Sequence, residues 1–177
     1  CPAPIPLYLP CMGISESALE KTSGLTAKIV GGASDIAAAD WARLTQADPA
    51  AKPYNPLISH AFLTSLEDSG CVGGRSGWHP RFLRIERDAA FAGMVPAYLK
   101  AHSQGEYVFD HGWADAFARA GGRYYPKLQV AVPFSPVTGP RLLTAAGADA
   151  EAVQHFSAQA LRAAANQLGA SSAHVTF

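Results

Sequence analysis

The chain has 177 residues, of which 49% are hydrophobic and 10% aromatic, and these proportions are ordinary for one globular domain with a sizeable core. Lysine and arginine together number 14, as do aspartate and glutamate, so the formal net charge is zero. A neutral chain lacks the basic surplus that broad binding to DNA or to an anionic membrane requires, and its apolar runs are far shorter than the roughly 20 residues of a transmembrane helix.

The first 26 residues are predicted to lie outside the fold. Residues 1–11 read CPAPIPLYLPC, and prolines at this density exclude a helix. No positively charged segment precedes them, so they are not typical of a signal peptide, and Met12 is the expected natural start. We therefore assign residues 1–26 to a disordered or non-native segment and residues 27–177 to one folded unit.

The folded unit is predicted to begin with one strand and two helices. Residues 26–30 form a short strand that Gly31 and Gly32 close. Ser34 or Asp35 then caps a helix that runs to about residue 46. After a proline-rich loop, Ser59 is expected to cap a second helix that ends near residue 69.

Two strands that form a hairpin are predicted next. Residues 82–87 alternate in polarity, residues 88–90 fit a turn, and residues 91–100 form the partner strand. Proline cannot donate a hydrogen bond to a neighbouring strand, so Pro96 is expected to mark a sheet edge or a bulge.

The second half of the unit alternates again between helices and strands. The predicted elements are a helix at 111–120 capped by Asp110, a strand at 127–132, a helix at 150–168 capped by Asp149, and a final strand at 173–177. The complete order indicates an α/β (α+β) fold in which helices flank a mixed, mostly antiparallel sheet. Loops on such a scaffold are where binding and catalytic residues commonly lie.

Polar and aromatic side chains are most concentrated between residues 99 and 141. Glycine and proline interrupt this stretch repeatedly, so much of it is expected to form a shaped surface. His111 is a candidate base because Asp110 precedes it and Asp115 follows one helical turn later. In the alternative interpretation, Asp110 is only a helix cap and His111 is an exposed residue of the first turn.

Three segments of this sequence resemble the FemAB-like family. They read NPLISHAFLTSLEDSGCVG, PAYLKAHSQGEYVFDHGWADAFARAGGRYYPKLQVAVPFSPVTGPRLL and SSAHVTF, and the resemblance covers roughly residues 27–177. Members of that family are bacterial proteins described as GNAT acyltransferases or as peptidoglycan-biosynthesis proteins. The resemblance implies a partial GNAT-like (acyl-CoA N-acyltransferase) fold. Family members are longer and have two related halves, so it also implies that this chain corresponds to the N-terminal half.

The resemblance implies a cytoplasmic enzyme that transfers an acyl or aminoacyl group to an amine. The donor would be acyl-CoA or aminoacyl-tRNA, and the acceptor a small molecule or a peptidoglycan precursor. Residues 133–148 lack the glycine-rich loop with which GNAT proteins hold the CoA pyrophosphate, which argues against CoA binding by this half. The expected protein partners are the C-terminal half of the same protein and a second copy paired through the free edge of the strand at 173–177.

A transfer to an amine requires a base that removes the amine proton. The predicted catalytic residues are His111, Glu106 and Asp115. The predicted substrate-binding residues are His102, Ser103, Gln104, Tyr107, Asp110, Trp113, Tyr124, Tyr125 and Lys127. No metal ion is expected.

Two alternatives of a different class stay open. The chain could be a non-catalytic recognition or scaffolding module that serves a second GNAT unit. It could also be a metal-dependent hydrolase built on His102, His111 and Asp115, although their spacing matches no established metal motif.

Overall fold

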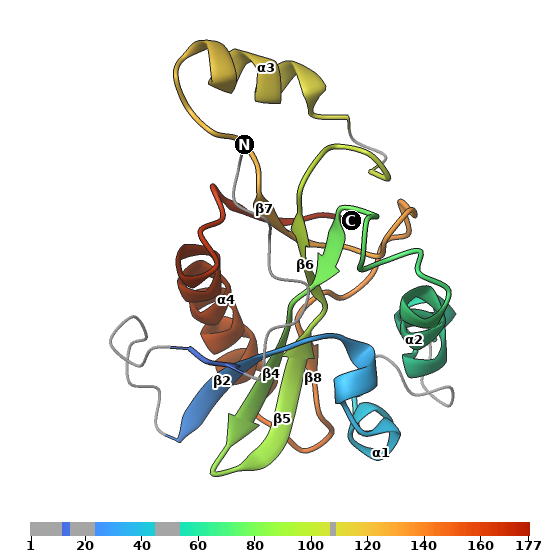
Figure 1. Ribbon diagram of the computed structural model, residues 1–177. Coiled ribbons are helices and arrows are strands. Elements are labelled where there is room, and N and C mark those ends of the chain that lie inside the picture. Colours follow the sequence, from blue (N-terminus) through green and yellow to red (C-terminus); the bar gives the residue numbers. More distant parts are fainter. Residues whose placement is uncertain (1–11, 15–23, 45–53, 107–108) are drawn as a thin grey trace.

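The computed structural model describes residues 12–14, 24–44, 54–106 and 109–177 (Figure 1). Its helices are α1 (Ala38–Trp41), α2 (His60–Asp68), α3 (His111–Arg119) and α4 (Ala150–Gln167), with 3-10 helices at Ala33–Asp35 and Pro56–Ile58. Its strands are β1 (Met12–Gly13), β2 (Leu25–Val30), β3 (Trp78–Pro80), β4 (Phe82–Arg87), β5 (Ala90–Val95), β6 (Ala97–Lys100), β7 (Lys127–Val130), β8 (Leu143–Thr144) and β9 (Ala173–Val175).

The strands form two sheets, whereas the sequence predicted one. The first sheet has the order β1-β2-β4-β5-β8 and is antiparallel, and the second has the order β3-β6-β7-β9 with a parallel β7–β9 pair. The predicted α/β class with mostly antiparallel strands is confirmed. The predicted elements appear in the predicted order, and β1, β3 and β8 are additional strands.

A long hairpin connects the two sheets. Its lower part is the β4–β5 pair of the first sheet, which turns at Asp88 and Ala89 as predicted, both with positive φ. Its upper part is the β3–β6 pair of the second sheet. The change of sheet falls at Arg81 on one arm and at Pro96 on the other, because proline cannot continue the hydrogen-bond ladder. Pro96 therefore marks the boundary between two sheets.

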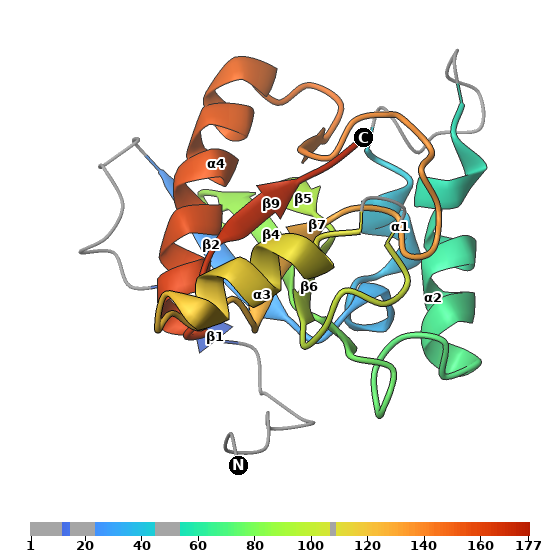
Figure 2. The same cartoon turned by 90° about the horizontal axis from the view of Figure 1, so that it is seen from above.

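The first sheet has a hydrophobic core on each face. Leu83 and Ile85 of β4 pack with Val153 and Phe156 of α4 in one core. Phe82, the alternate neighbour in β4, belongs to the other core, which contains residues of α1 and α2. Figures 1 and 2 show α4 and α2 on opposite sides of the strands. The burial of both faces fits the continuous apolar run of β5, AFAGMV.

The helices with confirmed caps are α2 and α4. The Ser59 side chain accepts a hydrogen bond from the Phe62 amide, and the Asp149 side chain accepts one from the Ala152 amide. The apolar residues at helical spacing along α4 are predicted to face inward, and all are buried except the half-buried Leu168; the buried ones are Val153, Phe156, Ala160, Leu161 and Ala164. None of the described helices is long and apolar enough to cross a membrane.

The first predicted helix is wrong in length and in its cap. Instead of one helix near 36–46, the chain forms the 3-10 turn Ala33–Asp35 and the short α1, and residues 45–46 lie outside the described part. The side chain of Glu67, which comes from α2, accepts the amide hydrogens of Ala33 and Ser34. A tertiary contact therefore replaces the local cap.

Candidate functional site

Two buried lysines face each other where β6 ends and β7 begins. Lys100 is the register partner of Lys127, and their side chains are 0% and 2% exposed. Like charges directly opposite one another on neighbouring strands destabilise a sheet, and buried charges require partners. The sequence supplies these partners from the loop that follows β6 and from the segment that precedes β7.

Asp110 is the centre of the hydrogen bonds that surround Lys127. Its Oδ2 accepts from the Lys127 Nζ at 2.5 Å and from the Tyr124 hydroxyl at 3.0 Å. Its Oδ1 accepts from the Tyr125 hydroxyl at 2.8 Å and from the Ser103 hydroxyl. We call Lys100, Ser103, Glu106, Asp110, Tyr124, Tyr125 and Lys127 the buried polar cluster.

The prediction that the Asp110 carboxylate caps α3 is therefore wrong. Asp110 does occupy the N-cap position, but its side chain makes no cap hydrogen bond. Its oxygens are turned to four donors that lie seven or more residues away in the sequence. A carboxylate gains more from a buried ammonium and three hydroxyls than from one exposed backbone amide.

The hydrogen bonds fix the charge state of Asp110. Burial alone would raise the pKa of its carboxyl group, but the hydrogen bonds from Lys127, Ser103, Tyr125 and Tyr124 outweigh burial and hold the pKa well below its usual range. Burial and the bond to Asp110 raise the pKa of Tyr124 to about 12, and the pKa of Tyr125 also rises. Asp110 thus stays ionised, and its lone pairs are occupied, which suits a positioning role.

Lys100 is the most enclosed charge of the cluster. Its Nζ lies 3.8 Å from the centroid of the Trp78 ring, donates to the Gln104 carbonyl and lies 3.7 Å from Glu106 Oε1. Burial lowers the pKa of Lys100 to about 8, an effect that Glu106 partly offsets and Lys127 reinforces. This amine therefore loses its proton within reach of physiological pH.

Glu106 is the carboxylate of the cluster with unused acceptor capacity. Its Oε2 accepts from the Lys127 Nζ at 2.9 Å. Its Oε1 is buried and accepts no hydrogen bond within the described ranges, although Lys100 is near. Since an ionised carboxylate offers about four acceptor positions, Glu106 can accept a further proton or hydrogen bond.

The structure brings together most of the residues that the sequence singled out. Ser103, Glu106, Asp110, Tyr124, Tyr125 and Lys127 all belong to the cluster, and the Gln104 carbonyl contacts it. His102 is half-buried beside Gly77, and burial together with Lys100 lowers its pKa. Tyr107 lies outside the described residues.

His111, Asp115 and Trp113 lie apart from the cluster, on the exposed surface of α3. The His111 ring stacks on Phe109 at 6.1 Å, and no hydrogen bond or ion pair within the described residues joins His111 to Asp115. Among all the residues that the structure describes, no three His, Cys, Asp or Glu side chains lie close enough together to hold a metal ion.

Lys100 and Trp78 are cluster contacts that the sequence did not assign to the site. Lys100 ends the apolar run of β6, and this position could have signalled a buried charge. A fully buried lysine almost always has a partner, so the signal would also have pointed to a nearby carboxylate. No local pattern connects Trp78 to Lys100, because β3 and β6 meet only through the hairpin register.

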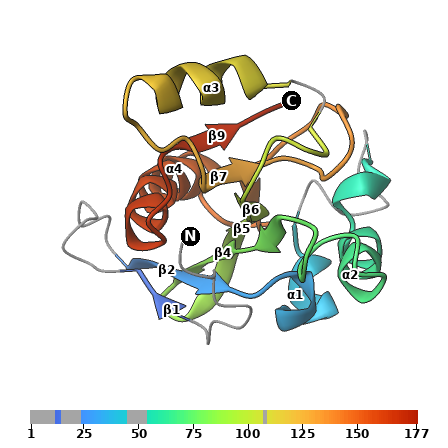
Figure 3. The same ribbon diagram turned by 45° about the horizontal axis from the view of Figure 1, so that its top comes forward.

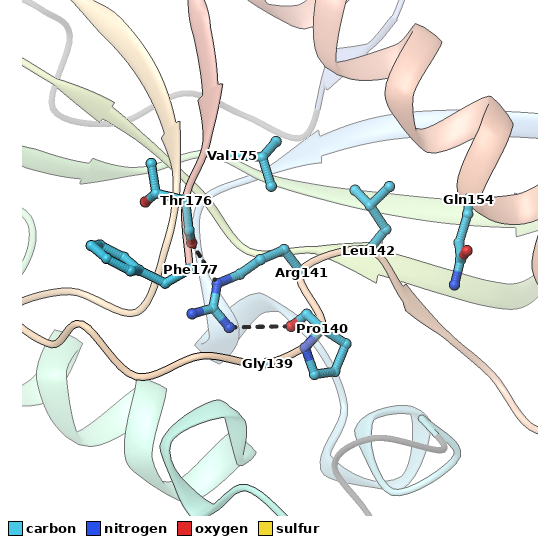
Figure 4. Close-up of a pocket in the computed structure, with 8 residues that line it drawn as sticks. All are labelled: Gly139, Pro140, Arg141, Leu142, Gln154, Val175, Thr176 and Phe177. Carbon is cyan, nitrogen blue, oxygen red and sulfur yellow. Dashed lines mark hydrogen bonds between the residues drawn. The ribbon is translucent and has the colours of Figure 1, made fainter.

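A pocket of about 320 Å³ lies beside the carboxyl end of β9 (Figure 4). Arg141 lines it and donates to the carbonyls of Thr176 at 3.2 Å, Pro140 at 3.3 Å and Val137 at 2.5 Å. These bonds attach the loop that precedes β8 to the end of β9. The role of Arg141 is therefore structural, because its hydrogen bonds hold two segments of the fold together.

The fold and the cluster define an α/β protein with a buried lysine–carboxylate cluster at one end of the second sheet. The model of the FemAB-like family, described as peptidoglycan biosynthesis/recognition, matches residues 32–177, and the chain belongs to this family. Comparison with curated proteins and with solved structures gives no match, so the GNAT-like fold stays a prediction.

Proposed function

We propose that this protein transfers an acyl or aminoacyl group to an amine in peptidoglycan metabolism, and that Glu106 accepts the proton of that amine. Family membership supports the pathway. The observation that carries the role of Glu106 is its buried Oε1, which has no hydrogen bond within the described residues and lies 3.7 Å from an ammonium group.

In the proposed reaction Glu106 is the base, and the other charged residues of the cluster hold it in position. The amine nitrogen attacks the carbonyl carbon of an acyl-CoA thioester or an aminoacyl-tRNA ester, so that a C–N bond forms and the C–S or C–O bond breaks. Glu106 takes the proton from nitrogen and returns it to the departing thiol or hydroxyl. Lys127 holds Glu106 at 2.9 Å, and Asp110 in turn holds Lys127. Because the Glu106 side chain is only 10% exposed, the proposal requires that the side chains around it move for the amine to reach its carboxylate.

A transfer assay tests this role. Purified protein is supplied with acyl-CoA or aminoacyl-tRNA and with amine-bearing peptidoglycan precursors, and the product is followed by mass spectrometry. Glu106→Gln keeps the shape of the side chain and should lower kcat by about 10²–10⁴-fold, the usual contribution of a general base. Glu151→Gln, at an exposed glutamate of α4, is the matched control and should keep the wild-type rate.

His111→Ala provides the competing test, because His111 is the other candidate base. If this substitution abolishes transfer while Glu106→Gln is active, the base is on α3 and our assignment of Glu106 is wrong. If Glu106→Gln abolishes transfer while His111→Ala is active, Glu106 is the base and His111 is a surface residue without a catalytic role.

A second candidate function is a recognition or scaffolding module without catalysis of its own. The mutual pairing of the two lysines and two carboxylates favours it, since a cluster of this kind also serves to fix a loop in one conformation. In that case the protein would bind a precursor but form no product with acyl-CoA or aminoacyl-tRNA. Glu106→Gln would then change the free energy of unfolding but not the affinity for the precursor.

A further inference from the structure

A separate pocket of about 360 Å³ is lined by residues from the neighbourhood of α1 and α2. Figure 3 shows these two helices on the same side of the molecule. Its walls come from four segments that are distant in sequence: the turn at 31–35, the end of α2, the glycine-rich loop 70–74, and the corner between β3 and β4 at 79–81. Its size is that of a small-molecule site.

One wall of this pocket is acidic. The Glu67 carboxylate accepts from the Ala33 amide at 2.6 Å, from the Ser34 amide at 3.1 Å and from the Ser34 hydroxyl. Asp35 Oδ2 accepts from the Gly31 amide at 2.7 Å. These backbone bonds fix both carboxylates in place, and each carboxylate has acceptor positions left for a ligand.

The pocket lining also carries a buried cation and a buried imidazole. Arg81 is 3% exposed and His79 is 9% exposed, and both line the pocket. Within the described part of the chain, neither ring nitrogen of His79 makes a hydrogen bond, and neither is fully sealed from solvent, so a ligand in the pocket can reach them. Burial, then the charges of Arg81 and His102, lower the pKa of His79, so its imidazole is neutral and can accept a hydrogen bond.

The presence of both acidic and basic side chains in the pocket determines which charges a ligand must carry. Glu67 and Asp35 would repel a simple anion, and Arg81 would repel a simple cation. A small molecule with an ammonium and a carboxylate group satisfies both kinds of side chain. It also satisfies His79, whose free nitrogen can accept from the ammonium.

We propose that this pocket binds the head group of an amino acid, with the carboxylate on Arg81 and the ammonium on Asp35, Glu67 and His79. The pocket is distinct from the buried polar cluster, and its ligand does not depend on the transfer reaction. The side chain of the amino acid would lie along the glycine-rich loop, where Gly73 and Gly74 leave open space.

An NMR titration of the ¹⁵N-labelled protein tests the proposal with four probes. L-Alanine and D-alanine carry both charges, ethylamine carries only the ammonium, and N-acetyl-L-alanine carries only the carboxylate. At least one alanine enantiomer should bind with a Kd of about 1 mM or tighter and shift the amide signals of residues 31–35 and 70–81. The two singly charged probes should bind at least about tenfold more weakly, because each lacks one charge-assisted contact.

Isosteric variants localise the binding. Asp35→Asn keeps an acceptor for the Gly31 amide but removes the charge, and it should weaken alanine binding by about tenfold. His79→Gln should weaken it as well. Asp68→Asn, an exposed aspartate of α2 that does not line the pocket, is the control and should bind as the wild type does.

Three results would overturn the proposal. The first is the absence of shifts with either alanine. The second is binding of ethylamine or N-acetyl-L-alanine as tight as that of alanine. The third is unchanged alanine affinity in a folded Asp35→Asn variant.

Discussion

The helices α3 and α4 carry similar apolar and polar alternation but have opposite environments. In α4, Val153, Phe156 and Ala160 are buried against the first sheet. In α3 no residue is buried, Trp113 is 75% exposed and Phe117 is 49% exposed. Figure 1 shows α3 at the margin of the molecule, away from the body that α4 joins.

The difference lies in what holds each helix. Strands from several parts of the chain cover α4, so the hydrophobic effect holds it. Polar contacts hold the segments on either side of α3: Asp110 precedes the helix, Tyr124 and Tyr125 follow it, and all three meet at the buried polar cluster. The Phe117 ring turns back to the Tyr124 ring at 6.2 Å. An amphipathic pattern therefore predicts a helix, but it does not determine which surface covers its apolar face.

The largest expected effect comes from the α4 side of this comparison. Phe156→Ala removes a ring that is 1% exposed and leaves a cavity, so the free energy of unfolding should fall by about 3–5 kcal/mol. Equilibrium unfolding in urea measures it. A loss below about 1 kcal/mol would mean that α4 does not pack on the sheet as described.

The next effect tests the polar attachment of α3. Asp110→Ala leaves Lys127 buried with only Glu106 as a counter-charge, so we expect a loss of about 3 kcal/mol. Asp149→Ala, which removes a true N-cap from α4, is the matched control and should cost about 1 kcal/mol. Equal losses from the two substitutions would indicate that Asp110 acts only as a cap.

The pH dependence of stability tests the burial of Lys100. In the folded protein the pKa of Lys100 is about 8, below its ordinary value of 10.5. Between pH 8 and pH 10 the unfolded chain therefore binds more protons at this site, and its contribution to stability rises with pH. Above pH 10 the raised pKa values of Tyr124 and Tyr125 act in the opposite direction. Lys100→Met should remove the rise, and thermal melts of both proteins across this window would measure it. Identical slopes would contradict the prediction.

The smallest effect is expected on the open face of α3. Trp113→Ala should change the free energy of unfolding by less than about 0.5 kcal/mol, because the ring is 75% exposed. A loss of unfolding free energy comparable to that of Phe156→Ala would show that Trp113 is buried in solution. The apolar face of α3 would then be covered as that of α4 is.

The sequence predicted which residues lie together in the candidate site better than it predicted their contacts. The density of polar residues in 99–141 identified six of the seven cluster members, all but Lys100. It assigned Asp110 to a helix cap because an aspartate before a helix is a local cap signal. The partners that outweigh this signal, Tyr124, Tyr125 and Lys127, lie 14 to 17 residues further along the chain.

The sequence by itself determined the elements whose stabilising contacts are local or periodic. The stripe and cap of α4, the cap of α2 and the β4–β5 hairpin are of this kind, since each depends on residues within a few positions of one another. Pro96 also signalled the interruption of its strand, because the missing amide hydrogen is a property of the residue.

Only the tertiary structure decided the division into two sheets and the pairing of charges. The register of β6 and β7 places Lys100 opposite Lys127, and no pattern within either strand contains that information. Once both ammonium groups are buried, the cost of an unpaired charge draws Asp110 and Glu106 inward. A backbone amide at a helix end can bond to water instead, whereas a buried ammonium cannot, and this asymmetry decided the role of Asp110.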